Sequence, residues 1–262
     1  MSRSKIGSGI HYILSYFKSL PRMILPGEPN LINHAIRSRH KRALTPLDRR
    51  GIDAIESVRQ AMLQSTSQIP IMEFGTGSSV LSKASSTEKV SEVCRFMSKS
   101  ERDCMFLYSL IKTLKPLNSI ELGTCLGISA AYIGSALVQN GSGSLVTFEG
   151  SPGRAKIAED NIRSLGLDKV VKLTEGRFQD TLGVYLQDIA SIDFAFVDGH
   201  HDGEATVGYF GQLLPQFKSG GIMVFDDIFW SVGMTKAWRA IKGYDSVMDC
   251  FEFKGMGIVQ VR

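Results

Sequence analysis

Beyond residue 100 of the 262-residue chain, apolar positions follow two patterns in alternation. Short apolar runs predict five buried strands, at 119–122, 145–149, 170–174, 192–197 and 222–225. Helical spacing of apolar residues predicts five helices, at 101–114, 128–139, 152–165, 178–189 and 203–217. Alternation of this kind is typical of right-handed βαβ units, which form a parallel sheet covered by helices on both faces.

The pattern changes near the C-terminus, after a helix predicted at about 234–242. Two β-rich runs, 247–253 and 257–261, are separated there only by residues 254–256. Because so short a connection cannot cross over between parallel strands, these two strands are predicted to pair as an antiparallel hairpin. The predicted fold is a doubly wound α/β domain with a seven-stranded, mostly parallel sheet and a C-terminal antiparallel hairpin.

The first 99 residues have a different character and are predicted to form a helical and loop extension to a main domain at 100–262. Residues 1–50 hold ten Lys or Arg against two Asp or Glu, a net charge of +8 within a chain of net charge +4. A basic segment can contact RNA or a membrane surface, or it can be a solvated arm. Helical spacing indicates a helix at 51–64, and the glycines of 73–79 indicate a turn or a loop over a ligand site.

The four cysteines and the length of the apolar runs limit the class of protein. Cys94, Cys104, Cys125 and Cys250 include no C-x-x-C pair and no zinc spacing, so we interpret them as buried thiols of a reduced, cytoplasmic protein. No apolar run approaches the roughly 18–20 residues that span a bilayer. The short apolar stretch 10–17 is interpreted as an amphipathic helix that packs on the body or on a second subunit, with an interfacial membrane helix as the alternative.

The turn after the first predicted strand contains Glu121, Gly123 and Gly127 in the spacing E-x-G-x-x-x-G. Glycines at such a turn let a ligand approach the backbone at the carboxyl ends of the strands. The spacing differs from the G-x-G-x-x-G of a dinucleotide site, whose pyrophosphate meets a helix N-terminus. A carboxylate before the first glycine suits a ligand that carries an ammonium group instead, although a purely structural tight turn would also explain the glycines.

Glu149 ends the second predicted strand, in the run Leu145 to Gly150. A carboxylate at this position can accept hydrogen bonds from both hydroxyls of a ribose. The alternative is a strand-end acid that faces solvent.

With these motifs, residues 100–262 resemble a class I S-adenosylmethionine-dependent methyltransferase, in the broad group that contains the small catechol and caffeoyl-CoA O-methyltransferases. The resemblance is carried by E-L-G-T-C-L-G-I-S, T-F-E-G, F-V-D-G-H-H, S-G-G-I-M-V-F-D-D-I-F-W and the final hairpin. The chain also resembles uncharacterised bacterial methyltransferases with an additional N-terminal region and a G-x-G-S element, as at 75–78.

The resemblance implies a role for each matching position toward the cofactor. The methionine part is expected at Glu121, Gly123, Gly127 and Ser129, and the ribose at Glu149. The adenine is expected at Phe178 and Gln179, with Asp198 and His200 also beside the cofactor.

The resemblance also implies catalytic groups at the ends of the fourth and fifth strands. Metal-dependent relatives bind a divalent cation such as Mg²⁺ through an aspartate and an Asp-Asn pair, which here are Asp198, Asp226 and Asp227. Where those relatives have a lysine as general base, this chain has His201, which can accept a hydroxyl proton near neutral pH. Alternatively, the two histidines shape a loop, and the acids cap a turn or orient His201 without a metal.

The predicted function is therefore transfer of a methyl group from S-adenosylmethionine to a hydroxyl of a small-molecule acceptor, with His201 and Asp198 as catalytic residues. The alternatives are an RNA methyltransferase that uses the basic segment, a NAD-dependent oxidoreductase on a similar sheet, and a binding protein without activity. A homodimer is a further expectation from the same resemblance.

Overall fold

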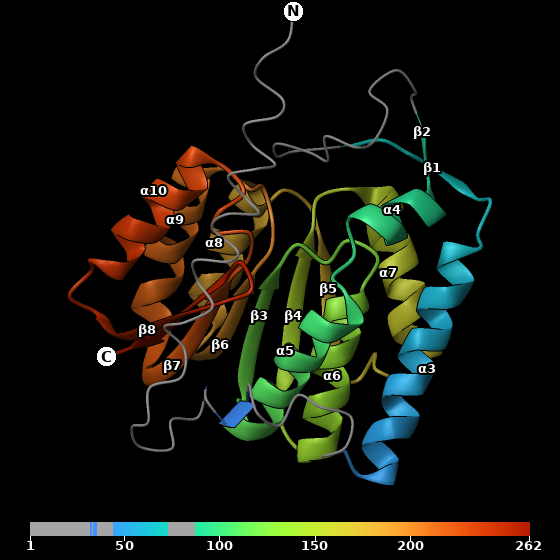
Figure 1. Cartoon of the computed structure of the whole chain (residues 1–262), viewed down its shortest axis with the longest axis horizontal. Helices are drawn as coiled ribbons and strands as arrows, with labels where there is room; N and C mark the ends of the chain where they lie inside the picture. Colours follow the sequence, from blue (N-terminus) through green and yellow to red (C-terminus); the bar gives the residue numbers. More distant parts are fainter. Residues whose placement is uncertain (1–31, 33, 36–43, 73–86) are drawn as a thin grey trace, which may run out of the picture.

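A central seven-stranded sheet organises the computed structural model, which describes residues 32, 34–35, 44–72 and 87–262 (Figure 1). The strand order is β5-β4-β3-β6-β7-β9-β8, with β3 to β7 parallel to one another and β9 antiparallel to both β7 and β8. The strands are β3 (Asn118–Leu122), β4 (Ser144–Glu149), β5 (Val171–Glu175), β6 (Ile192–Val197), β7 (Phe217–Phe225), β8 (Val247–Phe253) and β9 (Met256–Val261). The predicted fold class is confirmed, including the C-terminal hairpin.

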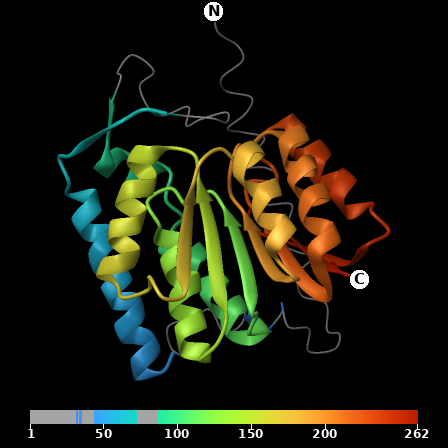
Figure 2. The same cartoon turned by 180° about the vertical axis from the view of Figure 1, so that it is seen from behind.

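Helices cover both faces of the sheet because the central strands are apolar on both sides (Figures 1 and 2). On β6, Phe194 and Phe196 belong to one hydrophobic cluster while Ala195 and Val197 belong to the other, as the two-residue repeat of a strand requires. The first cluster is covered by α3 (Pro46–Leu63), α5 (Glu101–Leu114), α6 (Ile128–Asn140) and α7 (Pro152–Ser164). The second is covered by α8 (Phe178–Asp188), α9 (Gly203–Leu213) and α10 (Val232–Lys242).

Several boundaries differ from the prediction, among them the start of β7, which lies five residues earlier than predicted, and two of the differences have clear local reasons. The predicted helix 203–217 ends earlier, at Leu213, because Pro215 follows and a short 3₁₀ turn leads into β7. The final hairpin turns on two residues, Lys254 and Gly255, whose φ angles of 50° and 83° are the left-handed pair that a tight hairpin turn needs.

Helix α3 begins at Pro46, five residues before the predicted start, because Thr45 and Asp48 form a capping box there. Asp48 also accepts a hydrogen bond from Tyr108 of α5 and lies 3.3 Å from the Lys112 ammonium, which fixes α3 to α5. The apolar face of α3 shares the first hydrophobic cluster with α5 and α6. The segment before residue 99 is thus anchored in the main core wherever it is described.

Three further elements were not predicted: β1 (Gln68–Pro70), β2 (Thr87–Lys89) and α4 (Val90–Phe96). The two short strands pair with each other and lie over the N-terminal end of α7 (Figure 1). Glu88 of β2 and Arg154 of α7 form a two-bonded ion pair, with 2.8 Å for each N–O distance, and both side chains are buried. The predicted glycine loop at 73–79, the apolar stretch 10–17 and most of the basic segment lie outside the described residues.

The cysteine interpretation needs one correction. Cys94 and Cys104 are buried and Cys125 is partly so, but Cys250 is exposed. It lies on β8, an edge strand whose central positions face solvent. Within the described residues, no helix is both long and apolar enough to cross a membrane.

Candidate active site

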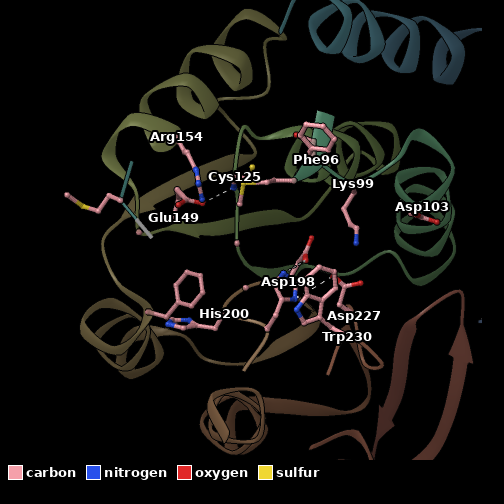
Figure 3. Close-up of a pocket in the computed structure, with 18 of the residues that line it drawn as sticks. Phe96, Lys99, Asp103, Cys125, Glu149, Arg154, Asp198, His200, Asp227 and Trp230 are labelled. Carbon is pink, nitrogen blue, oxygen red and sulfur yellow. Dashed lines mark hydrogen bonds and ion pairs between the residues drawn. The ribbon is translucent and has the colours of Figure 1, made fainter. Parts of the chain in front are cut away.

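A pocket of about 330 Å³ opens at the carboxyl ends of the parallel strands (Figure 3). Ligand sites of open α/β sheets lie at this edge, and the volume suits a small molecule. The pocket has two parts. The Glu149 end is lined by Gly123, Cys125, Glu149, Phe178 and His200, and the Lys99 end is lined by Lys99, Asp198, His201, Asp227 and Trp230.

The carboxylate of Glu149 is held in place by the backbone. Its Oε2 accepts a hydrogen bond from the Cys125 amide at 2.8 Å, and its Oε1 accepts one from the Ser151 amide at 2.9 Å. Burial raises the pKa of Glu149, and the two amide bonds lower it by less. Each carboxylate oxygen can accept a second hydrogen bond, so the fixed group can receive two hydroxyls from a ligand in the pocket.

The two glycines of the turn after β3 allow two different close approaches of the backbone. Gly123 has a φ of 107°, and a Cβ there would lie 2.2 Å from the Asp198 carbonyl oxygen, so only glycine fits between the β3 and β6 ends. Gly127 caps the N-terminus of α6 with a φ of 84°, and a Cβ there would lie 3.2 Å from the Ala158 backbone of α7. Gly123 lines the pocket, whereas Gly127 allows α6 and α7 to pack closely.

Glu121 and Ser129 lie behind the pocket wall. Glu121 is fully buried, and its Oε2 accepts a hydrogen bond from the Thr147 hydroxyl at 2.5 Å. Its Oε1 has no hydrogen-bond partner within the described part of the chain. Burial raises the pKa of Glu121 to about 7. A buried carboxyl oxygen without a partner has hydrogen-bonding capacity left for a ligand.

Aromatic rings form the floor of the Glu149 end. The ring centroids of Phe178 and His200 are 5.5 Å apart, and the Tyr209 hydroxyl lies 2.8 Å from His200 Nδ1. Gln179 Nε2 is 3.5 Å from His200 Nε2, at the limit of a hydrogen bond, and Gln179 itself does not line the pocket. The two ring planes meet at 68°, edge to face, so a ring of a ligand can stack against the open face of one of them.

His201 occupies the centre of the Lys99 end. Its Nδ1 lies 3.6 Å from Asp227 Oδ2, and its Nε2 lies 3.9 Å from Asp198 Oδ1. The Trp230 ring is 5.9 Å from the imidazole, centroid to centroid. His201 and Asp227 have φ angles of 46° and 50°, in the left-handed region that costs a non-glycine residue about 1–2 kcal/mol. Strained residues of this kind gather at functional sites.

Lys99 also lines this end of the pocket, and it was not predicted from the sequence. Its ammonium forms an ion pair with the buried Asp226 carboxylate, and its side chain points toward Asp198 and Asp227 (Figure 3). Burial alone would lower the pKa of Lys99, but the carboxylates of Asp198 and Asp227 raise it above its ordinary value. The sequence carries no local signal for this pair, because Lys99 and Asp226 are 127 residues apart.

The predicted metal ligands do not fit a divalent cation in this arrangement. Asp226 is paired with Lys99 rather than aimed at a shared centre with Asp198 and Asp227. Across 44–72 and 87–262, no three His, Cys, Asp or Glu side chains come together as a metal site. The positive charge next to these carboxylates belongs to the lysine.

Further pocket residues also escaped the sequence analysis. Apolar side chains from the segment before residue 100 line one wall, and Trp230, which had been noted only as a candidate packing residue, lines the pocket with 43% of its surface exposed. The additional lining side chains include Met72, Phe96, Met97, Asp103, Cys125, Arg154 and Arg177. Cys125 lies within the predicted glycine turn, whereas the others lie in ordinary helix or loop patterns that do not indicate a shared pocket.

Residues 120–228 match the model of a family described as a methyltransferase domain. The catechol O-methyltransferase of Niastella koreensis is 31% identical over 133 residues, which are 50% of this chain and 58% of that protein. The caffeoyl-CoA O-methyltransferase of Mesembryanthemum crystallinum is 27% identical over 52% of this chain and 53% of its own length. The chain therefore spans little more than half of these curated relatives.

Solved structures extend the likeness to most of the chain. An SAH-bound methyltransferase from Podospora anserina matches 91% of this chain and 98% of its own with a TM-score of 0.61, at 16% identity. The O-methyltransferase from Bacillus cereus in complex with SAH matches 62% of this chain and 82% of its own with a TM-score of 0.55, at 23% identity. The chain has the class I methyltransferase fold.

The segment that matches the methyltransferase family contains all the residues named for the Glu149 end but only some of those named for the Lys99 end. The residues from Glu121 to Asp227 that the sequence singled out lie within the matched segment 120–228. Lys99 and the apolar residues Phe96 and Met97 lie before it. The Lys99 end therefore combines the shared methyltransferase segment with a part of the chain that the family model does not cover.

Proposed function

We propose that the protein is an S-adenosylmethionine-dependent methyltransferase that methylates a hydroxyl oxygen of a small molecule. The main support is the layout of the pocket. A backbone-fixed carboxylate, Glu149, lies beside the Gly123 turn at one end, and His201 lies between two carboxylates at the other. The curated relatives support the reaction class, since both named above are O-methyltransferases.

The Glu149 end has the groups that the cofactor needs. Glu149 can accept the two ribose hydroxyls, Phe178 or His200 can stack on the adenine, and Gly123 lets the chain of the amino acid pass close to the backbone. Glu121 is buried behind this turn and does not line the pocket, so it would favour the cofactor's ammonium group through its charge rather than by direct contact. When bound, S-adenosylmethionine supplies a methyl group activated by a positively charged sulfur.

His201 is the general base in this proposal. It accepts the proton of the acceptor hydroxyl, and the carboxylates of Asp198 and Asp227 stabilise the resulting imidazolium. Lys99 is poorly suited to the same role because nearby carboxylates raise its pKa and keep it protonated. The oxygen freed of its proton would then bond to the methyl carbon while the bond from that carbon to the sulfur breaks, which leaves S-adenosylhomocysteine and a protonated His201.

The acceptor is a small molecule with a flat or apolar body. Phe96, Met97 and Trp230 line the pocket beside the charged groups, so an apolar ring can lie against them with its hydroxyl toward His201. The first two residues belong to the segment before residue 100, which would thereby cover the acceptor and set specificity. The relatives named for catechol and caffeoyl-CoA suggest a phenolic hydroxyl as the first class to screen.

Isothermal titration calorimetry of the purified chain with S-adenosylhomocysteine and, separately, with NADH tests this function. We expect one molecule of S-adenosylhomocysteine to bind with a Kd on the order of micromolar, about −8 kcal/mol, and no heat from NADH. Absence of binding by S-adenosylhomocysteine would reject the proposal. Tight binding of NADH alone would favour the oxidoreductase alternative.

A further inference from the structure

Lys99 places a fixed positive charge among the carboxylates of the pocket. Its ammonium pairs with Asp226, and its side chain extends toward Asp198 and Asp227 (Figure 3). The Lys99 and Asp226 side chains are only 17% and 4% exposed, so water screens their charges weakly. A cation in this position pairs with one of the three aspartates and reduces the repulsion among all of them.

The backbone of Lys99 is held independently of its ammonium. The Lys99 carbonyl accepts a hydrogen bond from Arg59 Nη1 of α3 at 2.7 Å. Arg59 is itself paired with Glu56 at 2.9 Å, and Glu56 accepts a hydrogen bond from Tyr132 of α6 at 2.8 Å. These bonds fasten the lysine to two helices of the core, so that the ammonium is delivered to one place rather than moving with a surface loop.

We propose that the Lys99 ammonium takes the place of a divalent cation in this pocket, so that the enzyme works without a metal. This inference rests on the proposed methyl transfer, in which the lysine has two roles. It offsets part of the negative charge of Asp198, Asp226 and Asp227, and it donates a hydrogen bond to the acceptor oxygen as that oxygen loses its proton to His201. An ammonium has three N–H donors, of which Asp226 takes one, so a donor is available for each role.

The chemistry of the acceptor favours this arrangement. An oxygen that gives up its proton develops negative charge, and a preorganised donor in a site shielded from water stabilises that charge strongly. His201 and Lys99 thus divide the work, with the histidine taking the proton and the lysine holding the anion. Lys99 is then a catalytic residue contributed from outside the segment that matches the methyltransferase family.

To test this inference, the protein is titrated with MnCl₂ in the presence and in the absence of S-adenosylhomocysteine. Binding of Mn²⁺ is measured by calorimetry and by the electron paramagnetic resonance signal of free Mn²⁺. We expect the wild type to bind no Mn²⁺ below about 1 mM, the weak end of oxygen-ligand sites. Lys99→Met removes the charge but keeps the length of the side chain, and it should gain one Mn²⁺ site at least about tenfold tighter than 1 mM. Lys99→Arg should stay as resistant to Mn²⁺ as the wild type.

Two controls separate this effect from unfolding or a general loss of charge. Lys218→Met removes a lysine that is paired with Asp193 at 3.0 Å at the opposite end of β6, and it should gain no site. Because Lys99→Met leaves Asp226 buried without its partner, Lys99→Met/Asp226→Asn provides a variant without that charge. The double variant should remain folded by thermal melting and lose the Mn²⁺ site that the single variant gains.

The results distinguish this inference from the proposed function. Binding of about one Mn²⁺ by the wild type below 1 mM would overturn the inference, as would a folded Lys99→Met variant that gains no site. Neither result depends on S-adenosylhomocysteine, whose failure to bind would reject the methyltransferase function instead. Once an acceptor is identified, Lys99→Met should lower turnover by about 10²–10³-fold, the effect of losing one oxyanion donor, and Mn²⁺ should restore part of it.

Discussion

Glu149 and His201 line the same pocket, but they are held by different parts of the protein. Glu149 is fixed by two backbone amides next to the turn after β3, as described for the Glu149 end. His201 is surrounded by side chains from other segments, including Asp198, Asp227 and Trp230, with Lys99 close by. Backbone geometry therefore defines one end of the pocket, and side-chain identity defines the other.

This difference matches what each end is proposed to do. A site formed by backbone amides and glycines depends on the fold, so it suits a ligand common to many proteins of that fold. A site formed by side chains from several segments can change one residue at a time, so it suits the part of the reaction that is specific to this chain. Lys99 and Phe96, which come from the segment before residue 100, belong to the second kind.

The neighbouring residues His200 and His201 lie at different ends of the pocket, so substituting each in turn tests this difference most directly. Substitution of His201 is expected to give the largest effect. Both have left-handed φ angles, 68° for His200 and 46° for His201, so asparagine is the substitution that preserves the backbone. We expect His201→Asn to lower turnover by about 10²–10⁴-fold, the usual contribution of a general base, while S-adenosylhomocysteine affinity changes little. Turnover of an identified acceptor and calorimetry with S-adenosylhomocysteine measure the two quantities.

The matched variant His200→Asn should show the opposite pattern. Its ring lies edge to face with Phe178 at the Glu149 end, where the adenine is proposed to stack, and one aromatic contact with the ligand contributes about 0.5–1.5 kcal/mol. The affinity for S-adenosylhomocysteine should therefore fall by about two- to tenfold, with turnover at saturating cofactor nearly unchanged. If His201→Asn kept normal turnover, His201 would have no role as a base.

Glu149→Ala tests the backbone-defined end, with an effect of intermediate size. It removes the acceptor for two ribose hydroxyls, and hydrogen bonds to a charged group contribute about 1.5–3 kcal/mol each. Because truncation also frees the Cys125 and Ser151 amides to contact the ligand, we expect a net loss of only about 10- to 100-fold in S-adenosylhomocysteine affinity.

The neighbouring strand provides the control for this prediction. Glu175 pairs in register with Glu149 at the end of β5, but its side chain is exposed and does not line the pocket. Glu175→Ala should leave the affinity at the wild-type value. An equal loss in both variants would mean that general negative charge at this edge, rather than a contact from Glu149, sets the affinity.

The sequence predicted the backbone-defined end far better than the other. Short apolar runs, helical spacing and the glycines at 123 and 127 are local patterns, and they located the sheet, the turn and Glu149 without knowledge of distant contacts. Lys99 could not be found in this way, because its partner Asp226 is 127 residues away and an ion pair leaves no periodic signal. The same holds for Phe96 and Trp230, which reach one wall through the folding of separate segments.

Glu121 is tested through the stability of the protein rather than through binding or turnover, and the test asks whether the carboxyl of this buried residue is unbalanced when no ligand is bound. Burial raises its pKa from 4.5 to about 7 in the folded protein, so between these values the folded state binds more protons than the unfolded state. The free energy of unfolding must then fall as the pH rises from about 4.5 to 7, by on the order of 2–3 kcal/mol from this group.

Glu121→Gln keeps an oxygen that can accept the Thr147 hydroxyl and removes the titration. Urea unfolding of the ligand-free protein at several pH values should show a shallower loss of stability in the variant, and above pH 7 the variant should be the more stable of the two. Parallel curves for both proteins would mean that Glu121 titrates normally and that its carboxylate is already balanced without a ligand. A shallower curve together with weaker S-adenosylhomocysteine binding would instead show that the backbone-defined end includes one side chain whose charge is stabilised only when the ligand is bound.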